Sequence, residues 1–159
     1  MIPPEQPVSS WSIQQSNITN NIKSIYFTDE FTGFAGGNSF PNDSNKILKT
    51  TDGGATWQRK LSVDSVSIIS IFFIDANTGF ASGTKGKIIR TLNGGNNWSA
   101  LTAPYTDVYL DIAFFDQLHG VASGNNGMII ATSDGGNTWQ STYGSSLLSY
   151  SSLSISSPS

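Results

Sequence analysis

The chain has 159 residues, of which 37% are hydrophobic and 12% charged, and its formal net charge is -3. This length suits one domain, and eight Lys and Arg residues without a basic run argue against a nucleic-acid partner. The absence of cysteine excludes disulfides, thiolate chemistry and cysteine-based metal sites. No apolar stretch approaches the roughly 18 residues of a membrane span, so we expect no membrane insertion.

The chain divides into an N-terminal arm, a repeat region and a short tail. Residues 1–10 are rich in Pro and Ser and are interpreted as a linker or irregular arm, without the pattern of a signal peptide. The repeat region is expected over residues 11–155, followed by a tail over 156–159. The abundance of Ser, Asn, Thr and Gly is typical of exported bacterial proteins, so a secreted or cell-surface location is expected.

Three similar units follow one another in the repeat region, and each is predicted to hold short β-strands. The first strand of each unit is an apolar run that suits a strand covered on both faces. An acidic residue then precedes a glycine by four positions, which indicates a hairpin. The units cover 20–61, 66–102 and 107–143; their first strands are expected at 22–27, 68–74 and 109–115, their second at 33–36, 79–83 and 120–124, and their third at 46–50, 87–91 and 128–132.

An eight-residue turn ending in tryptophan is the most regular feature of the sequence. Its Asp or Asn is expected to accept hydrogen bonds from backbone N–H groups one or two residues on, and its glycines to supply positive φ. Burial of the indole removes roughly 150–250 Å² from water, which is about 4–6 kcal/mol as an upper bound. The fourth strand is expected to start at the tryptophan. The residues assigned to this structural turn are Thr50, Asp52, Gly54, Thr56, Trp57, Thr91, Asn93, Gly95, Trp98, Thr132, Asp134, Gly136, Thr138 and Trp139.

The spacing of these turns predicts the fold. Trp57, Trp98 and Trp139 are separated by 41 residues, and a period of about 40 residues with four short strands is typical of a β-propeller blade. We therefore predict an all-β partial propeller of about three four-stranded blades, with incomplete blades at 11–15 and 147–155. Closed propellers have typically 4–8 blades, so we expect further blades or self-association to complete the ring.

The turn sequences match the Asp-box, a Ser/Thr-x-Asp-x-Gly-x-Thr-Trp signature of BNR-type repeats in bacterial sialidases and related propellers. The copies at 50–57 and 132–139 match fully, and the copy at 91–98 departs at Asn93 and Asn97. The longer pattern of apolar strand, Asp, Gly-aromatic-Ala, Ile-Ile/Leu-x-Thr and Asp-Gly-Gly-x-Thr-Trp resembles the photosystem II stability/assembly factor-like family. That resemblance implies a propeller; photosynthetic members are described as chaperone-like assembly factors with an Arg-rich surface.

Sialidase chemistry, as that resemblance implies it, needs three arginines, a Tyr nucleophile with a Glu partner, and an Asp acid/base. The chain has only Arg59 and Arg90, and its glutamates are Glu5 and Glu30. We therefore assign no catalytic residue and predict that the chain is not an enzyme. A longer parent protein with glycosidase activity stays open as an alternative.

The acidic residues of the turns have a metal-binding or catalytic interpretation and a structural one. Asn93 stands where the other turns have Asp52 and Asp134, and a site that needs charge would not tolerate this exchange. Asp29, Asp75 and Asp116 are likewise interpreted as turn formers, and His119 has no second histidine with which to bind a metal. We predict no metal and no cofactor.

A binding surface is the favoured functional prediction. In propellers the loops between the second and third strands and between successive blades share one face, and ligand contacts accumulate on such loops. We predict a non-enzymatic scaffold or interaction module of an exported or cell-surface protein that binds a protein or a glycan. The alternatives are a fragment of a sialidase-type glycoside hydrolase, or its glycan-binding portion, and a photosystem II assembly factor-like chaperone. The candidate binding residues are Phe40, Asp64, Lys85, Tyr105 and Asp107.

Overall fold

The structure is a computed structural model that describes residues 21–38, 45–62, 66–142 and 148–154. Within these residues the chain forms twelve β-strands and no helix. The strands are β1 (Ile22–Phe27), β2 (Gly33–Gly37), β3 (Asn45–Thr50), β4 (Gln58–Ser62), β5 (Ile68–Phe73), β6 (Gly79–Gly83), β7 (Ile88–Thr91), β8 (Ser99–Leu101), β9 (Tyr109–Phe114), β10 (Gly120–Gly124), β11 (Ile129–Thr132) and β12 (Gln140–Thr142).

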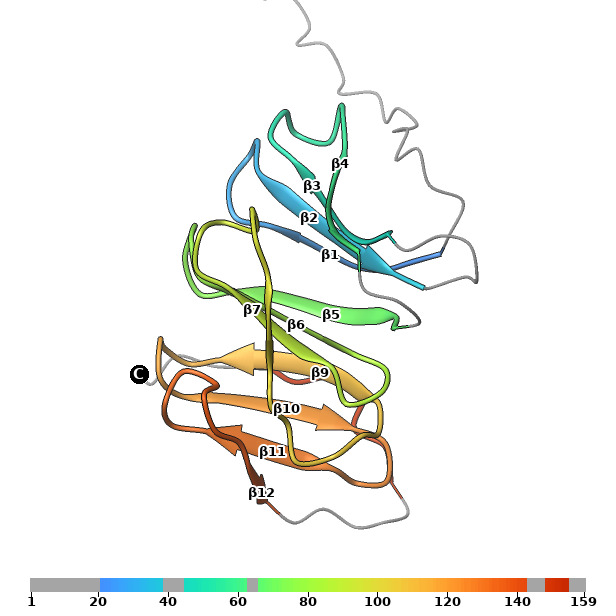
Figure 1. Cartoon of the computed structure of the whole chain (residues 1–159), viewed down its shortest axis with the longest axis vertical. Helices are drawn as coiled ribbons and strands as arrows, with labels where there is room; N and C mark the ends of the chain where they lie inside the picture. The colour runs from blue at the N-terminus through green and yellow to red at the C-terminus, as the bar shows by residue number, and fades with distance from the viewer. Residues whose placement is uncertain (1–20, 39–44, 63–65, 143–147, 155–159) are drawn as a thin grey trace, which may run out of the picture.

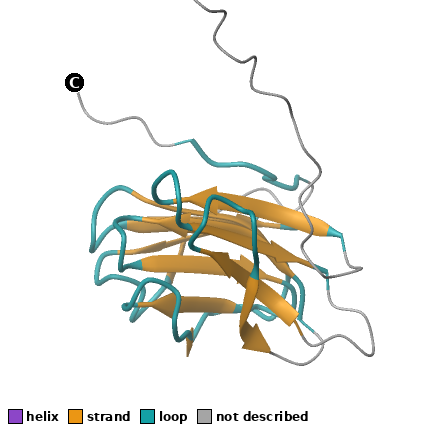
Figure 2. Cartoon of the chain, turned by 90° about the horizontal axis from the view of Figure 1, so that it is seen from above, coloured by secondary structure: helices purple, strands orange, loops and turns teal. Residues whose placement is uncertain are grey.

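The strands form three four-stranded antiparallel sheets in chain order, β1 to β4, β5 to β8 and β9 to β12. The sheets are stacked one upon another along the long axis of the molecule (Figure 1). Seen from above, the strands of successive sheets overlie one another, and their loops gather at the two ends of the sheets (Figure 2). This arrangement confirms the predicted partial propeller. We number the sheets blades 1, 2 and 3.

In each blade, an aromatic ring of the first strand lies over a glycine of the second strand. A Cβ atom added to Gly33 would overlap the ring of Phe27, and one added to Gly79 would overlap the ring of Phe73. Strands β2 and β6 are buried at every position. The small residues of the second strands are therefore required because the first-strand rings occupy the space above them.

The hydrophobic core lies between neighbouring blades. Phe34 of blade 1 stacks on Phe73 of blade 2 with ring centroids 4.2 Å apart, and Phe80 of blade 2 stacks on Phe114 of blade 3 at 3.8 Å. Stacked aromatic pairs of this kind add to the free energy of burial. Each interface also contains aliphatic residues, among them Ile47, Ile68, Ile71, Ala81 and Ile89 in one cluster and Ile88, Ile112, Ala122 and Ile130, beside the ring of Tyr109, in the other.

Strand β1 does not follow the prediction that the first strands are covered on both faces. Ile22, Ile25 and Phe27 are 39%, 60% and 41% exposed, whereas the corresponding residues of β5 and β9 are buried. The reason is positional, because β5 and β9 each lie against a preceding blade and no described residues cover the same face of β1. The apolar sequence of β1 is suited to a neighbour of the same kind.

The strand expected over residues 147–155 is absent from residues 148–154, which form no regular secondary structure. A strand needs a paired neighbour, and none of the described residues supplies a second strand beside this segment. The other expected partial strand, 11–15, lies outside the described residues.

Segment 148–154 nevertheless keeps the 41-residue spacing of the repeat. The N–H of Gly127 donates to the carbonyl oxygen of Leu148, just as the N–H of Gly86 donates to the carbonyl oxygen of Asp107 at 2.6 Å. The N–H of Tyr150 donates to the carbonyl oxygen of Gly124 at 3.3 Å. The segment therefore lies beside blade 3 where the first strand of another blade would lie.

Candidate binding site on the loop face

The Asp-box turn is a closed hydrogen-bonded unit. Thr50 Oγ1 donates to Asp52 Oδ1 at 2.7 Å and accepts from the N–H of Gly54 at 2.9 Å. Asp52 accepts from both the N–H and the hydroxyl of Thr56, at 2.8 and 2.6 Å. The expected acceptor role of Asp52 is present, but its partner lies four residues on, rather than one or two, because the turn folds back over its two glycines. The same contacts recur around Asp134.

Asn93 makes the same backbone contact without a charge. Its Oδ1 accepts from the N–H of Asn97 at 2.9 Å and from the hydroxyl of Thr91 at 3.1 Å. The second side-chain contact of the other turns is absent, since Asn97 replaces a threonine. Asp52, Asn93 and Asp134 thus each hold their turn through the same backbone hydrogen bond. This supports the structural interpretation of these side chains.

Hydrogen bonds to the carboxylates lower the pKa of Asp52 and Asp134. The hydroxyl and the N–H of the threonine four residues on, together with the threonine two residues before, bring each pKa from 3.8 to about 2. A carboxyl with a depressed folded-state pKa contributes stability that is present above its unfolded pKa and lost as the pH falls through the folded pKa. For these turns the window lies between about pH 4 and pH 2.

We expect the urea midpoint of unfolding to fall as the pH is lowered through this window. Replacing Asp52 and Asp134 together by Asn should make the fall shallower, because Asn93 shows that an amide keeps the backbone contact. Equilibrium urea titrations at several pH values between 5 and 2 measure the effect. An unchanged pH dependence in the double variant would show that the turn carboxylates contribute nothing to it. Asp29, Asp75 and Asp116 supply the dependence that remains, because their pKa values are also lowered.

The tryptophan of each turn packs edge-on against the first-strand phenylalanine of its own blade. The centroid distances are 6.3 Å for Phe27 and Trp57 and 6.0 Å for Phe114 and Trp139. Trp139 is 7% exposed, whereas Trp57 and Trp98 are half-buried. Each indole ring therefore covers the first-strand phenylalanine of its own blade.

The acidic residues of the first hairpins also hold turns. Asp116 accepts from the N–H groups of Leu118 and His119 at 2.7 Å and lies 2.9 Å from His119 Nδ1. Backbone and side-chain hydrogen bonds from His119 lower the pKa of Asp116 to about 2. Both side chains are more than half exposed, so their attraction is screened by water.

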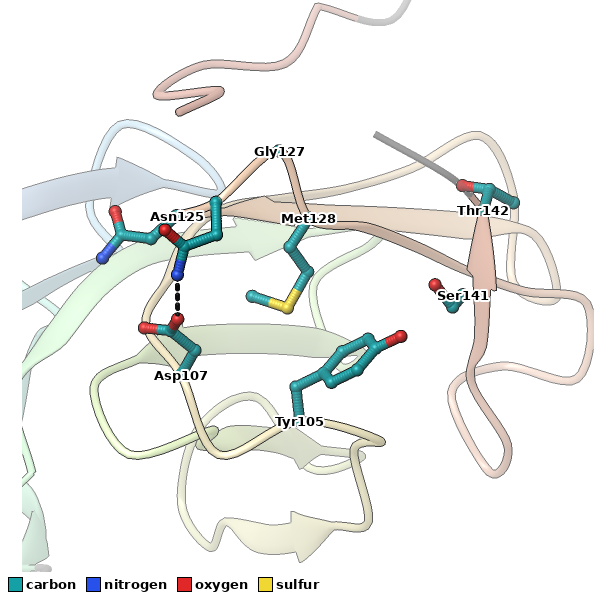
Figure 3. Close-up of a pocket in the computed structure, with 8 residues that line it drawn as sticks. Tyr105, Asp107, Asn125, Gly127, Met128, Ser141 and Thr142 are labelled. Atoms are coloured by element: carbon teal, nitrogen blue, oxygen red, sulfur yellow. Dashed lines mark hydrogen bonds between the residues drawn. The ribbon is translucent and has the colours of Figure 1, made fainter. Parts of the chain in front are cut away.

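A pocket opens at the loops of blade 3, at the end of the strands opposite to the Asp-box turns. It encloses about 590 Å³ and lies between the linker that leads into β9, the loop between β10 and β11, and the outermost strand β12 (Figure 3). The lining residues are Tyr105, Asp107, Asn125, Asn126, Gly127, Met128, Ser141 and Thr142. The pocket thus combines an aromatic ring, a thioether, amides, hydroxyls and one carboxylate.

Hydrogen bonds fix the polar side of the pocket. Asp107 accepts from the side chain of Asn126 and from the N–H of Val108, both at 2.7 Å. Asn126 has a left-handed backbone with φ of 57°, a conformation that Asn adopts more readily than most residues. This turn brings the Asn126 amide onto Asp107 and leaves the remaining lone pairs of the carboxylate for a ligand.

Tyr105 and Met128 form the apolar side. The sulfur of Met128 points into the space between Asp107 and the Tyr105 ring (Figure 3). Tyr105 is 43% exposed, and its carbonyl oxygen accepts from the hydroxyl of Tyr109 at 3.4 Å. Burial raises the pKa of Tyr109 to about 12, so its hydroxyl remains protonated near neutral pH. The ring of Tyr105 is therefore open to a ligand, while the hydrogen bond from Tyr109 holds the Tyr105 backbone in place.

Two of the five candidate binding residues, Tyr105 and Asp107, line this pocket. Lys85 does not; it occupies the blade 2 position that matches Asn126, also with a left-handed φ of 58°. Phe40 and Asp64 lie outside the described residues. The sequence analysis pointed to the loops between second and third strands, which include Asn125, but missed Met128 at the end of that loop. It also missed Ser141 and Thr142 of β12, which lie across the pocket. The only signal for them was their position at strand ends beside the loops.

Among the described residues, no group of three or more Asp, Glu or His side chains is arranged to hold a metal ion. These same ranges contain no helix with the length and hydropathy needed to cross a membrane.

Three stacked four-stranded sheets, each with a Gly-Gly turn closed by a tryptophan, define a β-propeller repeat protein of the Asp-box class. A sequence model described as photosynthesis system II assembly factor YCF48 matches residues 3–104 and 95–151. The chain therefore belongs to the YCF48 family, which confirms the resemblance seen in the turn sequences. No curated protein matches the sequence.

Solved structures show the same fold. YCF48 bound to a D1 peptide superposes with a TM-score of 0.69 at 27% identity, covering 81% of this chain and 42% of that one. YCF48 from Cyanidioschyzon merolae has a TM-score of 0.61 at 23% identity, covering 78% and 41%. An ancestral GH74 enzyme gives 0.69 at 21% identity, covering 85% and 20%. The chain thus spans less than half the length of each, and the last two likenesses show the fold alone.

Proposed function

We propose that this chain is a non-enzymatic propeller module of the assembly-factor type, which binds an extended segment of a partner protein in the pocket beside Tyr105. The observation that carries the proposal is the convergence of Tyr105, Asp107 and Met128 with the outermost strand of blade 3. Membership of the YCF48 family supports a scaffold role.

The chemistry of the pocket suits a peptide. An exposed tyrosine ring gives a large contact area at a low cost in side-chain entropy, and a flexible thioether adapts to neighbouring side chains. Asp107 accepts hydrogen bonds, and Asn125 supplies both donors and acceptors. Ser141 and Thr142 belong to β12, whose outer edge is unpaired within the described residues. An extended peptide can add hydrogen bonds along such an edge.

The D1 peptide seen on a related YCF48 is the probe that this proposal suggests. This chain spans 42% of the length of that relative. We therefore propose D1 as a partner of this chain and do not carry it over from the relative. The peptide is expected to bind the full chain with modest affinity, as is common for a segment that becomes ordered on binding. Loss of the Tyr105 ring should weaken such binding by about tenfold, since aromatic anchors carry much of the energy of small interfaces.

The test titrates a labelled synthetic D1 peptide against the chain and against Tyr105→Ala, with fluorescence anisotropy as the measurement. Leu92→Ala is the matched control, since Leu92 is 64% exposed on the Asp-box turn that follows β7, whereas the loops of the pocket precede β9 and β11 and so lie at the other end of the strands. The control should bind like the unsubstituted chain. Equal binding by all three proteins would place the contact elsewhere and overturn the proposal.

A xyloglucan oligosaccharide is the second ligand in the same assay, because the fold is shared with a GH74 xyloglucanase from Xanthomonas campestris. Exposed aromatic rings beside polar groups also bind sugars. Saturable binding of the oligosaccharide that requires Tyr105, without binding of the peptide, would replace the protein-binding proposal by a glycan-binding one. Release of reducing sugar would contradict the non-enzymatic assignment.

A further inference from the structure

The positive charge of the chain is confined to its first part. All eight Lys and Arg residues lie between Lys23 and Arg90, and residues 91–159 contain neither residue type. His119, in this second part, is paired with Asp116 at 2.9 Å. Every residue that lines the pocket of blade 3 belongs to the part without Lys and Arg. The acidic residues of that part are Asp107, Asp111, Asp116 and Asp134.

Met128 of the pocket occupies a position that is a lysine in the other two blades. Lys46 and Lys87 hold this place in blades 1 and 2. The loop before it has the same backbone in blades 2 and 3, since Lys85 and Asn126 have left-handed φ values of 58° and 57°. Blade 3 has thus exchanged both lysines of the blade 2 loop for neutral side chains on an unchanged turn.

The linker before the first strand carries the opposite exchange. Asp107 stands where blade 2 has Val66, which is 4% exposed. One carboxylate oxygen of Asp107 accepts from the N–H of Val108 and the other from the side chain of Asn126, both at 2.7 Å. Both donors are neutral, and among the described residues no Lys or Arg forms an ion pair with Asp107. The carboxylate is therefore held in place without being neutralised.

The cations of the neighbouring third strands are used in contacts between blades. Lys49 Nζ donates to the carbonyl oxygen of Gly94 at 2.6 Å, and Arg90 Nη1 donates to that of Gly135 at 2.9 Å. Both contacts are made to Asp-box turns, at the end of the strands away from the pocket. Blade 3 has Ala131 at the corresponding position. These contacts therefore supply no positive charge to the pocket.

The apolar side of the pocket suits the stem of a long basic side chain. Such a stem packs on apolar surface while its charged head seeks polar partners. The Met128 sulfur lies between Asp107 and the Tyr105 ring (Figure 3), so apolar surface leads up to the carboxylate. A tyrosine ring attracts a cation over its face, and a planar guanidinium both stacks on such a ring and pairs with two carboxylate oxygens. The arrangement therefore favours arginine over lysine.

We propose that the pocket selects a basic side chain, arginine before lysine, in the segment that it binds. This inference rests on the proposed function, since the basic side chain belongs to the bound segment. The guanidinium pairs with Asp107, and its stem lies along Met128 and the Tyr105 ring. A neutral side chain of the same shape leaves the carboxylate without a countercharge. The matching loop of blade 2 repels such a ligand, because it carries Lys85 and Lys87.

The test titrates N-acetyl-arginine methylamide and its neutral isostere, N-acetyl-citrulline methylamide, into the isotope-labelled full chain, with amide NMR shifts as the measurement. The arginine compound should shift the N–H signals of Val108 and Gly127 saturably and leave that of Gly53, in the Asp-box turn of blade 1, in place. The citrulline compound should bind at least about fivefold more weakly, because it lacks the charge-assisted hydrogen bonds. Raising NaCl from about 50 to about 500 mM should weaken only the arginine compound, because salt screens its charge.

Two variants of Met128 separate charge from packing. Met128→Lys gives the pocket the residue of the other blades, and the added cation should weaken binding of the arginine compound by about tenfold. Met128→Leu is the matched control and should retain binding, since it keeps an apolar side chain. Asp107→Asn should bind the arginine compound no better than the citrulline compound, which gives a second measurement if Met128→Lys does not fold. The amide spectrum of each variant shows whether it is folded.

Equal affinity for the arginine and citrulline compounds would overturn the inference, as would the absence of a saturable shift with arginine or equal binding by the two Met128 variants. The proposed function fails separately. If the D1 peptide binds through Tyr105 while the two compounds behave alike, the peptide-binding role stands and the charge selection is wrong. If the arginine compound binds and the D1 peptide does not, the charge selection stands and D1 is the wrong partner.

Discussion

Replacement of Gly95 by Ala should destabilise the chain by about 2–5 kcal/mol. Gly95 has φ of 73°, and a non-glycine residue in this left-handed region costs about 1–2 kcal/mol. In addition, a Cβ at this position would overlap the ring of Phe34 in the preceding blade. That ring is held between blades on Phe73, so it cannot move aside, and overpacking of this kind costs about 1–3 kcal/mol. Equilibrium urea unfolding followed by tryptophan fluorescence measures the loss.

Gly54→Ala is the control for Gly95→Ala, because Gly54 stands at the same position in the turn of blade 1. It also has a positive φ, of 94°, but a Cβ there would meet only Trp57, at 3.7 Å. The backbone strain is thus present in both variants, and the overlap with a neighbouring blade only in Gly95→Ala. We expect Gly95→Ala to exceed Gly54→Ala by at least about 1 kcal/mol. Equal losses would mean that the turn does not pack rigidly against the blade before it.

The blades could be predicted from the sequence because their determinants are local. Each first strand is a continuous apolar run, each second strand begins with glycine, and each Gly-Gly turn ends in tryptophan. The 41-residue intervals from Trp57 to Trp98 and from Trp98 to Trp139 then indicate a repeating unit of fixed size. The exposure of β1 could not be predicted in this way, because it depends on which blade precedes it.

The contacts between blades were harder to predict because they join residues about 45 positions apart. Lys49 and Arg90 look like ordinary charged residues of exposed strands, and their partners are carbonyl oxygens, which have no sequence signature. The one available signal was the alignment of the two cations with Ala131 in blade 3. For the pocket, Tyr105 and Asp107 were identifiable as loop residues. Met128 lies just before β11, where the other blades have Lys46 and Lys87, so the repeat did not indicate a thioether in the pocket.

The interfaces explain how a chain with 12% charged residues and small blades can hold its shape. No blade has a core of its own, since the largest buried side chains lie between sheets. Stability in such an array is approximately a sum of blade and interface terms. Two interfaces are present among the described residues, so a substitution that removes one ring stack is expected to remove a large part of the total.

Phe73→Ala should therefore destabilise the chain by about 3–5 kcal/mol, the usual cost of removing a buried phenylalanine. The Phe73 ring is 3% exposed, stacks on Phe34 at 4.2 Å and meets Trp98 edge-on at 6.0 Å. The chain's whole stability is expected to be about 5–15 kcal/mol. Phe73→Leu, which should cost less, keeps the measurement within range if the alanine variant does not fold.

Phe27→Ala isolates the part of this loss that comes from the neighbouring blade. Phe27 has the same surroundings within its own blade, over Gly33 and edge-on to Trp57 at 6.3 Å, but it is 41% exposed and has no partner ring from a preceding blade among the described residues. We expect a loss of about 1–2 kcal/mol, because less apolar area is removed from contact. If both alanine variants lose the same free energy of unfolding, the stacked rings between blades contribute little, and the stability of the array resides within its single sheets.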